Sequence, residues 1–309
     1  MGSRSMPESD LSIEWRGPDG SVWNVSGRDA ERQGVLLLPK PTKLYDAPTV
    51  TYWSQSAWKH VYQGFRLERR EPVIGFQIWG GLGGDARDWR DIDSEFSLSW
   101  EFEREGELVF ITDDGERSLG LRKLSDPVCY EGEIENGRDP HLLADATVVI
   151  NAAGENPLWK GELVTTDPFV CPTTSGSTTF TVANDGNTDL WLRWTASATP
   201  AGARFTFPDY SFGNDEYGRA QADSGRTWTT PVLLAGEHID VNADPDEELF
   251  LSSKGTNPWN RCEGNGLMYP IPPHTPPTEL TVSWTGVAAG DSIGLQYQRM
   301  YTRPWGVSR

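Results

Sequence analysis

The motif Gly290-Asp291-Ser292-Ile293-Gly294 matches the G-x-S-x-G pattern that surrounds the nucleophilic serine of many hydrolases. That chemistry needs a strand-turn-helix setting and, later in the chain, a histidine that acts as a base. The residues after the motif alternate like a strand, and the last histidine, His274, precedes the serine. We therefore interpret the motif as a hairpin turn.

The run Gly80–Gly84 is rich in glycine and lies between an expected strand and an expected helix, where a phosphate-binding loop could form. A Walker loop would continue with Lys and then Ser or Thr. Here Asp85 and Asp88 follow instead, and their charges oppose phosphate. No G-x-G-x-x-G dinucleotide pattern is completed either. The run predicts flexible backbone beside a packing surface.

Acidic residues gather in two places where calcium could bind. An EF-hand loop needs glycine at its sixth position and a carboxylate at its twelfth. Phe96 and Phe102 occupy those positions in the first cluster, and Leu249 occupies the sixth in the second. Neither cluster is an EF-hand, but an irregular calcium site at Asp244–Glu248 is the alternative to a solvated turn. The clusters are Asp91, Asp93 and Glu95, and Asp244, Asp246, Glu247 and Glu248.

The four histidines and three cysteines have no metal-binding spacing and form no C-x-x-C pair, so we expect reduced structural thiols. A carboxylate pair for glycoside hydrolysis has no sequence signature, because any two of the 45 acidic residues could converge in space. We predict no enzyme, no catalytic residue, no metal and no cofactor. The residues considered are His60, His141, His238, His274, Cys129, Cys171 and Cys262.

Tryptophan is the residue type that most favours a binding function, because exposed indoles stack on sugars and anchor protein interfaces. Trp191 and Trp194 have opposite parity in one expected strand, so one should face the core and the other should not. Trp259 is expected on a loop. Carbohydrate binding is therefore an alternative to a purely structural use of these side chains.

The chain has 309 residues and a formal net charge of −18, with about −12 in residues 1–168 and −6 in residues 169–309. Such a field repels phosphate backbones, so we expect no tight binding of DNA or RNA. No stretch approaches the roughly 20 apolar residues of a membrane span, and the first fifteen residues contain no signal-like apolar run. We expect a soluble protein that is not secreted.

The first half reads as strands and turns, with one short helix. Asp85 is expected to cap that helix, which places Trp89 and Ile92 on one face. No alternation of strands and helices suggests a parallel sheet. Residues 11–15, 22–25, 73–79, 96–102, 108–111, 118–124, 146–150 and 158–164 are expected to form strands.

After residues 165–168 the chain changes to short alternating segments rich in Thr and Ser, typical of a β-sandwich or jelly roll. The Pro-rich residues 270–277 should form a rigid connection and no central strand. Two β domains follow, residues 1–168 and 169–309, with a seam near Asp167-Pro168. The expected strands are residues 178–182, 189–195, 204–207, 228–234, 238–242, 248–252, 279–284 and 292–301.

The order of these features resembles the distal tail proteins of siphophages, and most closely the minor tail proteins of actinobacteriophages. Asp85-Ala86-Arg87-Asp88-Trp89-Arg90 introduces the helix, and Asn156-Pro157-Leu158-Trp159-Lys160-Gly161 closes the first half. The second half is similar to the family's galectin-like sandwich. That half contains Asn184-Asp185-Gly186-Asn187, Gly236-Glu237-His238-Ile239-Asp240-Val241 and Tyr301-Thr302-Arg303-Pro304-Trp305-Gly306 in this order.

The resemblance implies a mostly β virion protein of the tail tip, assembled in the host cytoplasm. Its N-terminal tail-tube-like β-sandwich or barrel would form a ring of six copies that joins the tail tube to the tip or baseplate. The implied partners are other copies, the tail tube protein, the tape measure protein and other tip proteins. Genomic DNA would pass through the acidic lumen without specific binding.

The galectin likeness does not bring a sugar site with it. Galectins bind sugar through an H-x-N-x-R run, and His238-Ile239-Asp240-Val241-Asn242 does not match it. No sugar-binding residue is therefore carried over, and glycan binding by the second half remains the alternative function.

Overall fold

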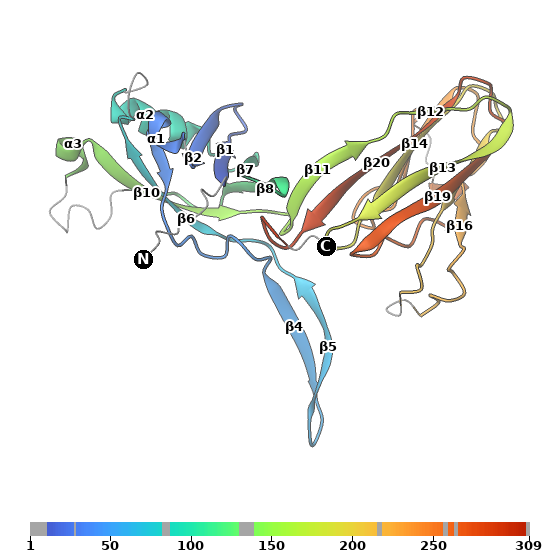
Figure 1. Cartoon of the computed structure of the whole chain (residues 1–309), viewed down its shortest axis with the longest axis horizontal. Coiled ribbons are helices and arrows are strands. Elements are labelled where there is room, and N and C mark those ends of the chain that lie inside the picture. Colours follow the sequence, from blue (N-terminus) through green and yellow to red (C-terminus); the bar gives the residue numbers. More distant parts are fainter. Residues whose placement is uncertain are drawn as a thin grey trace, which may run out of the picture. The chain divides into compact units, whose positions relative to one another are not determined.

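The computed structural model describes residues 11–306 except residues 28, 82–86, 130–138, 215–217, 256–258 and 263–264, and without the side chain of Trp259. These residues form two compact units. Unit 1 contains the chain up to Gly161 together with Tyr301–Gly306, and unit 2 contains Glu162–Met300. The chain enters unit 2 within β11 (Trp159–Thr165) and leaves it at the end of β20 (Ser292–Tyr301) (Figure 1). The seam near Asp167-Pro168 remains a prediction.

Unit 1 consists of two antiparallel layers, in the orders β2-β1-β7-β8 and β9-β10-β6-β3. The layers meet where the end of β8 pairs with the end of β10, Lys123 opposite Ala152. They do not close into a barrel in the described part of the chain. The bounds are β1 Ser12–Arg16, β2 Val22–Ser26, β3 Val35–Leu37, β6 Val73–Trp79, β7 Gly106–Thr112, β8 Gly115–Lys123, β9 Val128–Cys129 and β10 Asp145–Ala153.

The helix α2 (Trp89–Leu98) corrects two expectations. Its N-cap is Asp88, whose carboxylate accepts the backbone N–H of Arg90, whereas Asp85 lies outside the described residues. The expected strand 96–102 is wrong, because Phe96 completes the buried helical face of Trp89 and Ile92. Leu98, which would share the buried face of Phe96 in a strand, is exposed. The helical spacing of Trp89, Ile92 and Phe96, and not the alternation that begins at Phe96, therefore describes this segment.

An aromatic stack explains why α2 ends where it does. Trp100, just past the helix, stacks on Trp15 of β1 with 3.5 Å between ring centroids. The Trp15 indole N–H donates to Ser99 Oγ at 3.0 Å, and that hydroxyl donates to the Phe96 carbonyl. The turn after α2 is thus tied to the sheet, and both tryptophans are fully buried.

Unit 1 also has elements that were not expected. Three helices are described in place of one, since α1 (Ala30–Gln33) and α3 (Pro140–Leu143) each form a single turn. The strands β4 (Thr49–Gln55) and β5 (His60–Leu67) form a separate two-stranded sheet. The two single-turn helices have too few residues to show a helical period.

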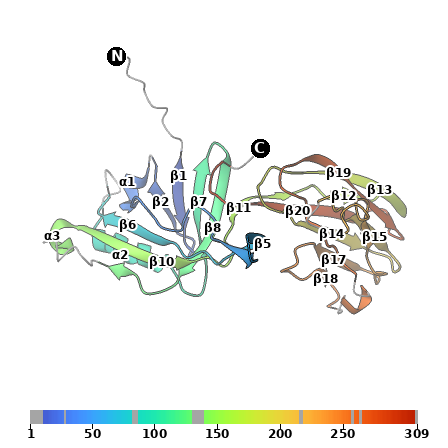
Figure 2. The same cartoon turned by 90° about the horizontal axis from the view of Figure 1, so that it is seen from below.

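Unit 2 is a sandwich of two antiparallel sheets, in the orders β18-β17-β14-β20, with β12 pairing with the start of β20, and β13-β19-β15-β16 (Figures 1 and 2). Its core is aromatic, and includes Trp194, Phe207, Trp228 and Trp284. The mostly β fold class is confirmed. The bounds are β12 Phe169–Val170, β13 Ser175–Asn184, β14 Leu192–Ala198, β15 Arg204–Pro208, β16 Thr227–Thr229, β17 Glu237–Asn242, β18 Phe250–Ser252, η2 Trp259–Arg261 and β19 Thr275–Thr285.

The Pro-rich segment is only partly a connection. β19 already begins at Thr275, so the expectation of a connection is wrong for residues 275–277, although at this end β19 pairs only with β13. The β13–β19 pairing accommodates Pro276 and Pro277 for two reasons. Its register shifts opposite them, between Val182 and Asn184, and β15 pairs only with the far end of β19. A bulge with one open side does not need the missing N–H groups.

The chain end is held in unit 1 by a buried guanidinium. Arg117 of β8 is almost inaccessible to solvent, and its Nη1 donates to the carbonyls of Arg303 at 3.0 Å and Gly306 at 2.9 Å. Its guanidinium carbon lies 3.6 Å from the centre of the Tyr301 ring. A buried cation satisfied by carbonyls and an aromatic face fixes the segment Tyr301–Gly306.

Replacing Arg117 should release this segment. We expect Arg117→Leu to cost about 2–4 kcal/mol, because two partly buried carbonyls and the Tyr301 ring lose the cation that they contact. Hydrogen-exchange mass spectrometry should show faster exchange in residues 301–306. The exposed Arg32→Leu is the control and should change stability by less than about 0.5 kcal/mol. Unchanged exchange in Arg117→Leu would contradict this role.

A second buried charge stabilises unit 2. The Glu237 carboxylate is fully buried and accepts hydrogen bonds from Arg261 at 2.6 Å, from Ser252 and from the backbone N–H of Leu234 at 2.7 Å. Burial by itself would raise the pKa of this carboxyl, but these donors outweigh it and lower the pKa to about 2. The interaction therefore favours folding while Glu237 is ionised.

This arrangement predicts a defined pH dependence. Because the folded pKa lies below the unfolded value of about 4.3, the stabilisation is complete above that value and is lost as pH falls toward 2. Glu237→Gln should lose on the order of 2–3 kcal/mol at pH 7, measured by urea unfolding. The difference from the wild type should shrink between pH 4.5 and 2.5. The exposed Glu248→Gln should show no such trend, and a constant difference for Glu237→Gln would refute the explanation.

Candidate assembly surface

The β4–β5 hairpin is the most exposed ordered element of unit 1. All seven residues of β4 are exposed, and six of the eight in β5. Ser56 closes the turn by hydrogen bonds with the backbone of Lys59, and no third strand among the described residues joins the pair (Figure 1). An isolated two-stranded hairpin is marginally stable in water, so this one is a candidate for stabilisation by contact with another protein surface.

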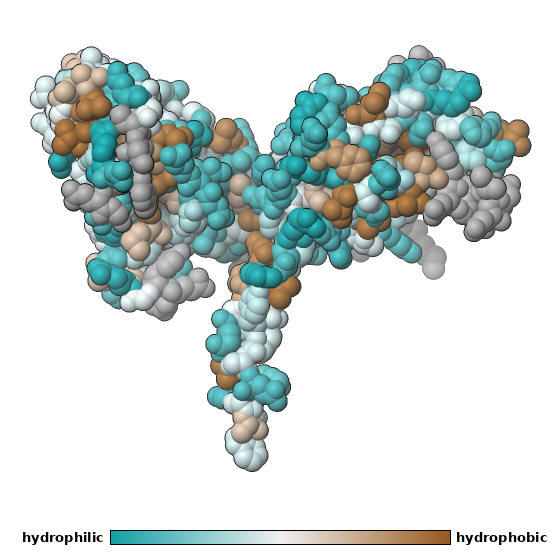
Figure 3. Space-filling view, turned by 180° about the vertical axis from the view of Figure 1, so that it is seen from behind, coloured by the Kyte–Doolittle hydropathy of each residue, from teal (hydrophilic) through white to brown (hydrophobic). Residues whose placement is uncertain are grey.

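Both faces of the hairpin carry aromatic side chains. Trp53 lies opposite Tyr62, 5.3 Å between ring centroids, and Phe65 lies opposite Thr51 on the same face. Tyr52 is on the other face, where the guanidinium of Arg66 lies 5.7 Å from its ring centre. The exposed fractions are 58% for Trp53, 61% for Phe65 and 96% for Trp58 in the turn. Figure 3 shows apolar and pale residues among polar ones along this arm.

The hairpin also differs from the rest of the chain in charge. Residues 49–69 contain three basic side chains, Lys59, Arg66 and Arg69, and one acidic side chain, Glu68, so they carry +2 while the remainder carries −20. A basic aromatic arm is complementary in charge to an acidic surface. Aromatic residues and Arg are also the types enriched at interface centres.

Arg70 holds the root of the hairpin. This side chain is fully buried, and it donates through Nε and Nη2 to the carbonyl of Pro157 and through Nη1 to that of Leu44. Its guanidinium carbon lies 5.6 Å from the centre of the Trp159 ring. Burial lowers the pKa of Arg70 to about 10, so the group still carries its proton at neutral pH. The two hairpin ends and β11 are thereby joined.

The returning chain end completes this root. The Ala47 N–H donates to the Thr302 carbonyl at 3.0 Å, and Arg303 forms an ion pair with Asp46 at 2.9 Å. Trp305 packs against Tyr45, 5.3 Å between ring centroids. The residues that precede β4 therefore depend on a segment more than 250 positions away in the sequence.

The sequence interpretation missed this hairpin altogether. Its signals were present, since Thr49-Val50-Thr51-Tyr52-Trp53 is rich in residues that favour strands and the region is basic in an acidic chain. Exposure on both faces removes the alternation of apolar and polar residues on which strand prediction depends.

The G-x-S-x-G motif occupies a connection between sheets. Gly290 and Asp291 precede β20, whereas the preceding strand β19 belongs to the other sheet, so the interpretation as a hairpin turn is wrong. Asp291 is buried and accepts the N–H and hydroxyl of Thr199. Ser292 Oγ lies 3.3 Å from Ser197 Oγ. No hydrogen bond in the described residues joins either serine to His238, so no triad forms there.

The two acidic clusters and the glycine-rich run do not form a recognisable site among the described residues. Asp91, Asp93 and Glu95 lie on α2, where Glu95 pairs with Arg87 at 2.9 Å. No group of three potential metal ligands occurs in the part of the chain that the structure describes, and this includes Asp244–Glu248. In the run 80–84 only Gly80 and Gly81 are described.

The remaining expectations have mixed outcomes. Trp194 is fully buried and Trp191 is not, as their parity predicts, whereas the side chain of Trp259 lies outside the description. All three cysteines are free thiols, with Cys129 exposed and the other two buried. No helix among the described residues is long and apolar enough to cross a membrane.

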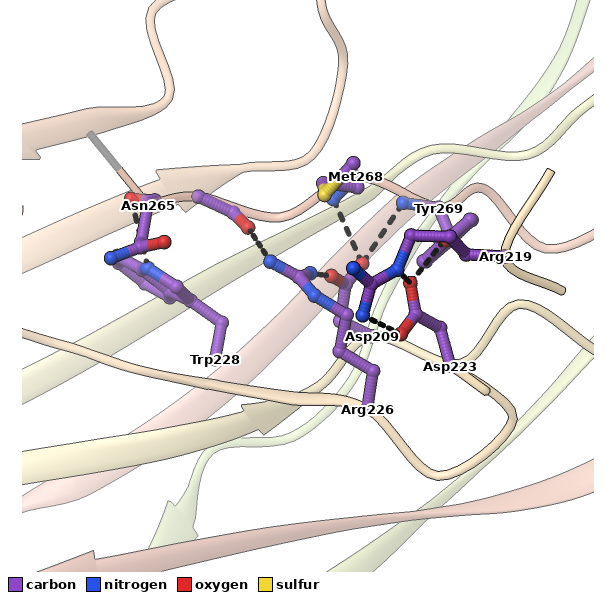
Figure 4. A network of polar contacts seen from close by, with 9 residues as sticks. Asp209, Arg219, Asp223, Arg226, Trp228, Asn265, Met268 and Tyr269 are labelled. Carbon is purple, nitrogen blue, oxygen red and sulfur yellow. Dashed lines mark hydrogen bonds and ion pairs between the residues drawn. The ribbon is translucent and has the colours of Figure 1, made fainter. Parts of the chain in front are cut away.

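A polar network pins the long loops of unit 2 (Figure 4). Asp209 is buried, forms an ion pair with Arg226, and accepts the backbone N–H groups of Met268 and Tyr269, both at 2.9 Å. The Tyr269 hydroxyl donates to Asp223 at 2.6 Å, a bond that holds the pKa of this carboxyl below its usual value. These charges are paired with one another, so the network positions loops.

Comparison with known proteins agrees with this architecture. The chain is 26% identical to minor tail protein Gp27 of Mycobacterium phage D29 and 24% identical to minor tail protein Gp27 of Mycobacterium phage L5. In both cases the similarity covers 97% of this chain and 99% of the relative. No protein-family model matches the chain.

The fold is also found in a solved structure. The crystal structure of SPP1 Dit (gp 19.1), described as a hub adsorption apparatus of phages that infect Gram-positive bacteria, matches with a TM-score of 0.55 at 13% identity. The match covers 94% of this chain and 98% of that one. The resemblance to siphophage distal tail proteins is therefore confirmed: this chain is a homologue of mycobacteriophage minor tail proteins and has the fold of a Dit protein.

Proposed function

We propose that this protein is the distal tail protein of a phage tail tip, and that six copies form a ring through unit 1. The ring would join the tail tube to the tip or baseplate and anchor other tip proteins. The exposed, aromatic and basic β4–β5 hairpin carries this proposal, because such an arm is complementary to a neighbouring acidic copy.

A ring requires a head-to-tail interface, in which an arm on one side of each copy contacts a different surface of the next. The hairpin provides such an arm, and its root is fixed by Arg70 and by Ala47. Its open strand edges offer backbone groups for pairing in addition to aromatic side chains. Six-fold symmetry itself comes from the resemblance to distal tail proteins.

The remaining parts of the proposal follow from this role. Partners would be the tail tube protein, the tape measure protein and other tip proteins, with assembly in the host cytoplasm. Genomic DNA would pass through the lumen without specific binding, since the acidic chain repels phosphate. A structural role without catalysis fits the paired charges of unit 2. Glycan binding by unit 2 would add to this role.

The hairpin makes the ring testable. The purified wild type should assemble to six times the 34.4 kDa of one chain, measured by light scattering. Trp53→Ser combined with Phe65→Ser should weaken assembly by roughly 30-fold or more, because two interface aromatics are lost. Arg66→Glu should also weaken it, and added salt should weaken the wild type.

Val232→Ser, which removes an exposed apolar side chain from unit 2, is the matched control and should leave assembly unchanged. Full assembly by the Trp53 and Phe65 double variant would exclude the hairpin as the ring contact. A wild-type protein that stays monomeric and is absent from the tail tip in cryo-electron micrographs of virions would refute the proposed function itself.

A further inference from the structure

A groove of about 480 Å³ lies on the outer face of the β18-β17-β14-β20 sheet, entirely within unit 2. Leu251 and Ser253 line one side and Pro168 lines the other. This volume is within the roughly 300–1,000 Å³ typical of small-ligand sites. It contains none of the loops pinned by Asp209.

Small polar side chains from three adjacent strands form the floor. In the strand register Thr195 lies opposite both Asp240 and Gly294, and Ser197 lies opposite His238. Side chains that face each other in this way lie on the same side of a sheet. A Cβ at Gly294 would come within 2.7 Å of Thr195 Oγ1, so glycine keeps this part of the floor low.

The floor offers donors and acceptors close together. Ser197 Oγ accepts the Ser292 N–H at 2.7 Å and lies 3.3 Å from the Ser292 hydroxyl. Among the described residues no hydrogen bond engages the Thr195 hydroxyl or the His238 imidazole, and both residues are exposed. Hydroxyl and neutral imidazole groups each can donate and accept. Ligands that do the same, such as sugar hydroxyls, match this surface.

Charge narrows the ligand class further. Asp240, the carboxylate on the floor, is neutralised by Arg193, which donates from Nε to both of its oxygens at 2.8 and 2.9 Å. The chain as a whole carries −18, which disfavours anionic polymers. The exposed Leu251 supplies an apolar wall for the C–H face of a sugar ring.

We propose that this groove is a binding site for a neutral oligosaccharide. Thr195, His238 and the Ser197–Ser292 pair bind its hydroxyl groups, and Leu251 contacts a ring face. The site uses other residues than the H-x-N-x-R pattern of galectins, and it does not depend on ring formation.

Ligand-observed NMR on the full-length protein tests the site, with neutral oligomers of glucose, galactose and mannose and with hyaluronan oligomers as the anionic probe. We expect saturation transfer to at least one neutral oligomer and none to hyaluronan. Thr195→Trp, which fills the groove, and His238→Ala should each reduce affinity at least tenfold. Thr181→Trp places the same substitution on an exposed position of β13 in the opposite sheet and should leave binding unchanged.

The outcomes separate cleanly. Binding that persists in Thr195→Trp, or that is lost equally in Thr181→Trp, would overturn the site. Preference for hyaluronan would overturn the ligand class, and a flat response to all neutral oligomers would overturn the proposal. Release of reducing ends would mean that the groove is catalytic and would also contradict it. Light scattering on the same samples reports the ring separately.

Discussion

The buried guanidinium of Arg70 is the interaction on which the proposed assembly surface depends. A cation without solvent contact is costly unless its donors are satisfied, and here backbone carbonyls of Pro157 and Leu44 together with the Trp159 ring satisfy it. These partners come from two segments, residue 44 and residues 157–159, which lie far apart in the sequence. Ionisation of one side chain therefore fixes the direction in which the hairpin leaves unit 1.

In both units, buried charged side chains hold irregular segments of the chain in place. Arg117 holds the chain end through carbonyls, Glu237 holds the β17–β18 region through donors, and Asp209 holds two loops. In each case a buried charge forms hydrogen bonds with backbone groups of irregular segments, and at Glu237 also with the side chains of Arg261 and Ser252. Apolar packing by the aromatic cores stabilises the sheets, while these charges determine where irregular segments lie.

Most strands with one buried face could be predicted from the sequence, because burial imposes a period of two. Val73–Trp79 was predicted to the residue. The segment 96–102 failed because Phe96 and Trp100 satisfy both a helical and an alternating pattern, and only packing on Trp15 decides between them. The β4–β5 hairpin was not predicted for the opposite reason: both of its faces are exposed, so its sequence shows no alternation of apolar and polar residues. Arg70 and Arg117 could not be recognised, because their partners are carbonyls, which any sequence supplies.

The fold-back of Tyr301–Gly306 has a consequence for biosynthesis. Translation proceeds from the N-terminus, and domains usually fold as they emerge from the ribosome. Unit 1 cannot do so completely before unit 2 has been made, since Ala47 and Arg117 find their partners Thr302 and Gly306 only after residues 301–306 have left the exit tunnel. The root of the β4–β5 hairpin is thus completed only after all of unit 2 has been synthesised. Nascent chains translated together on one messenger RNA would therefore expose a β4–β5 hairpin whose root is not yet fixed.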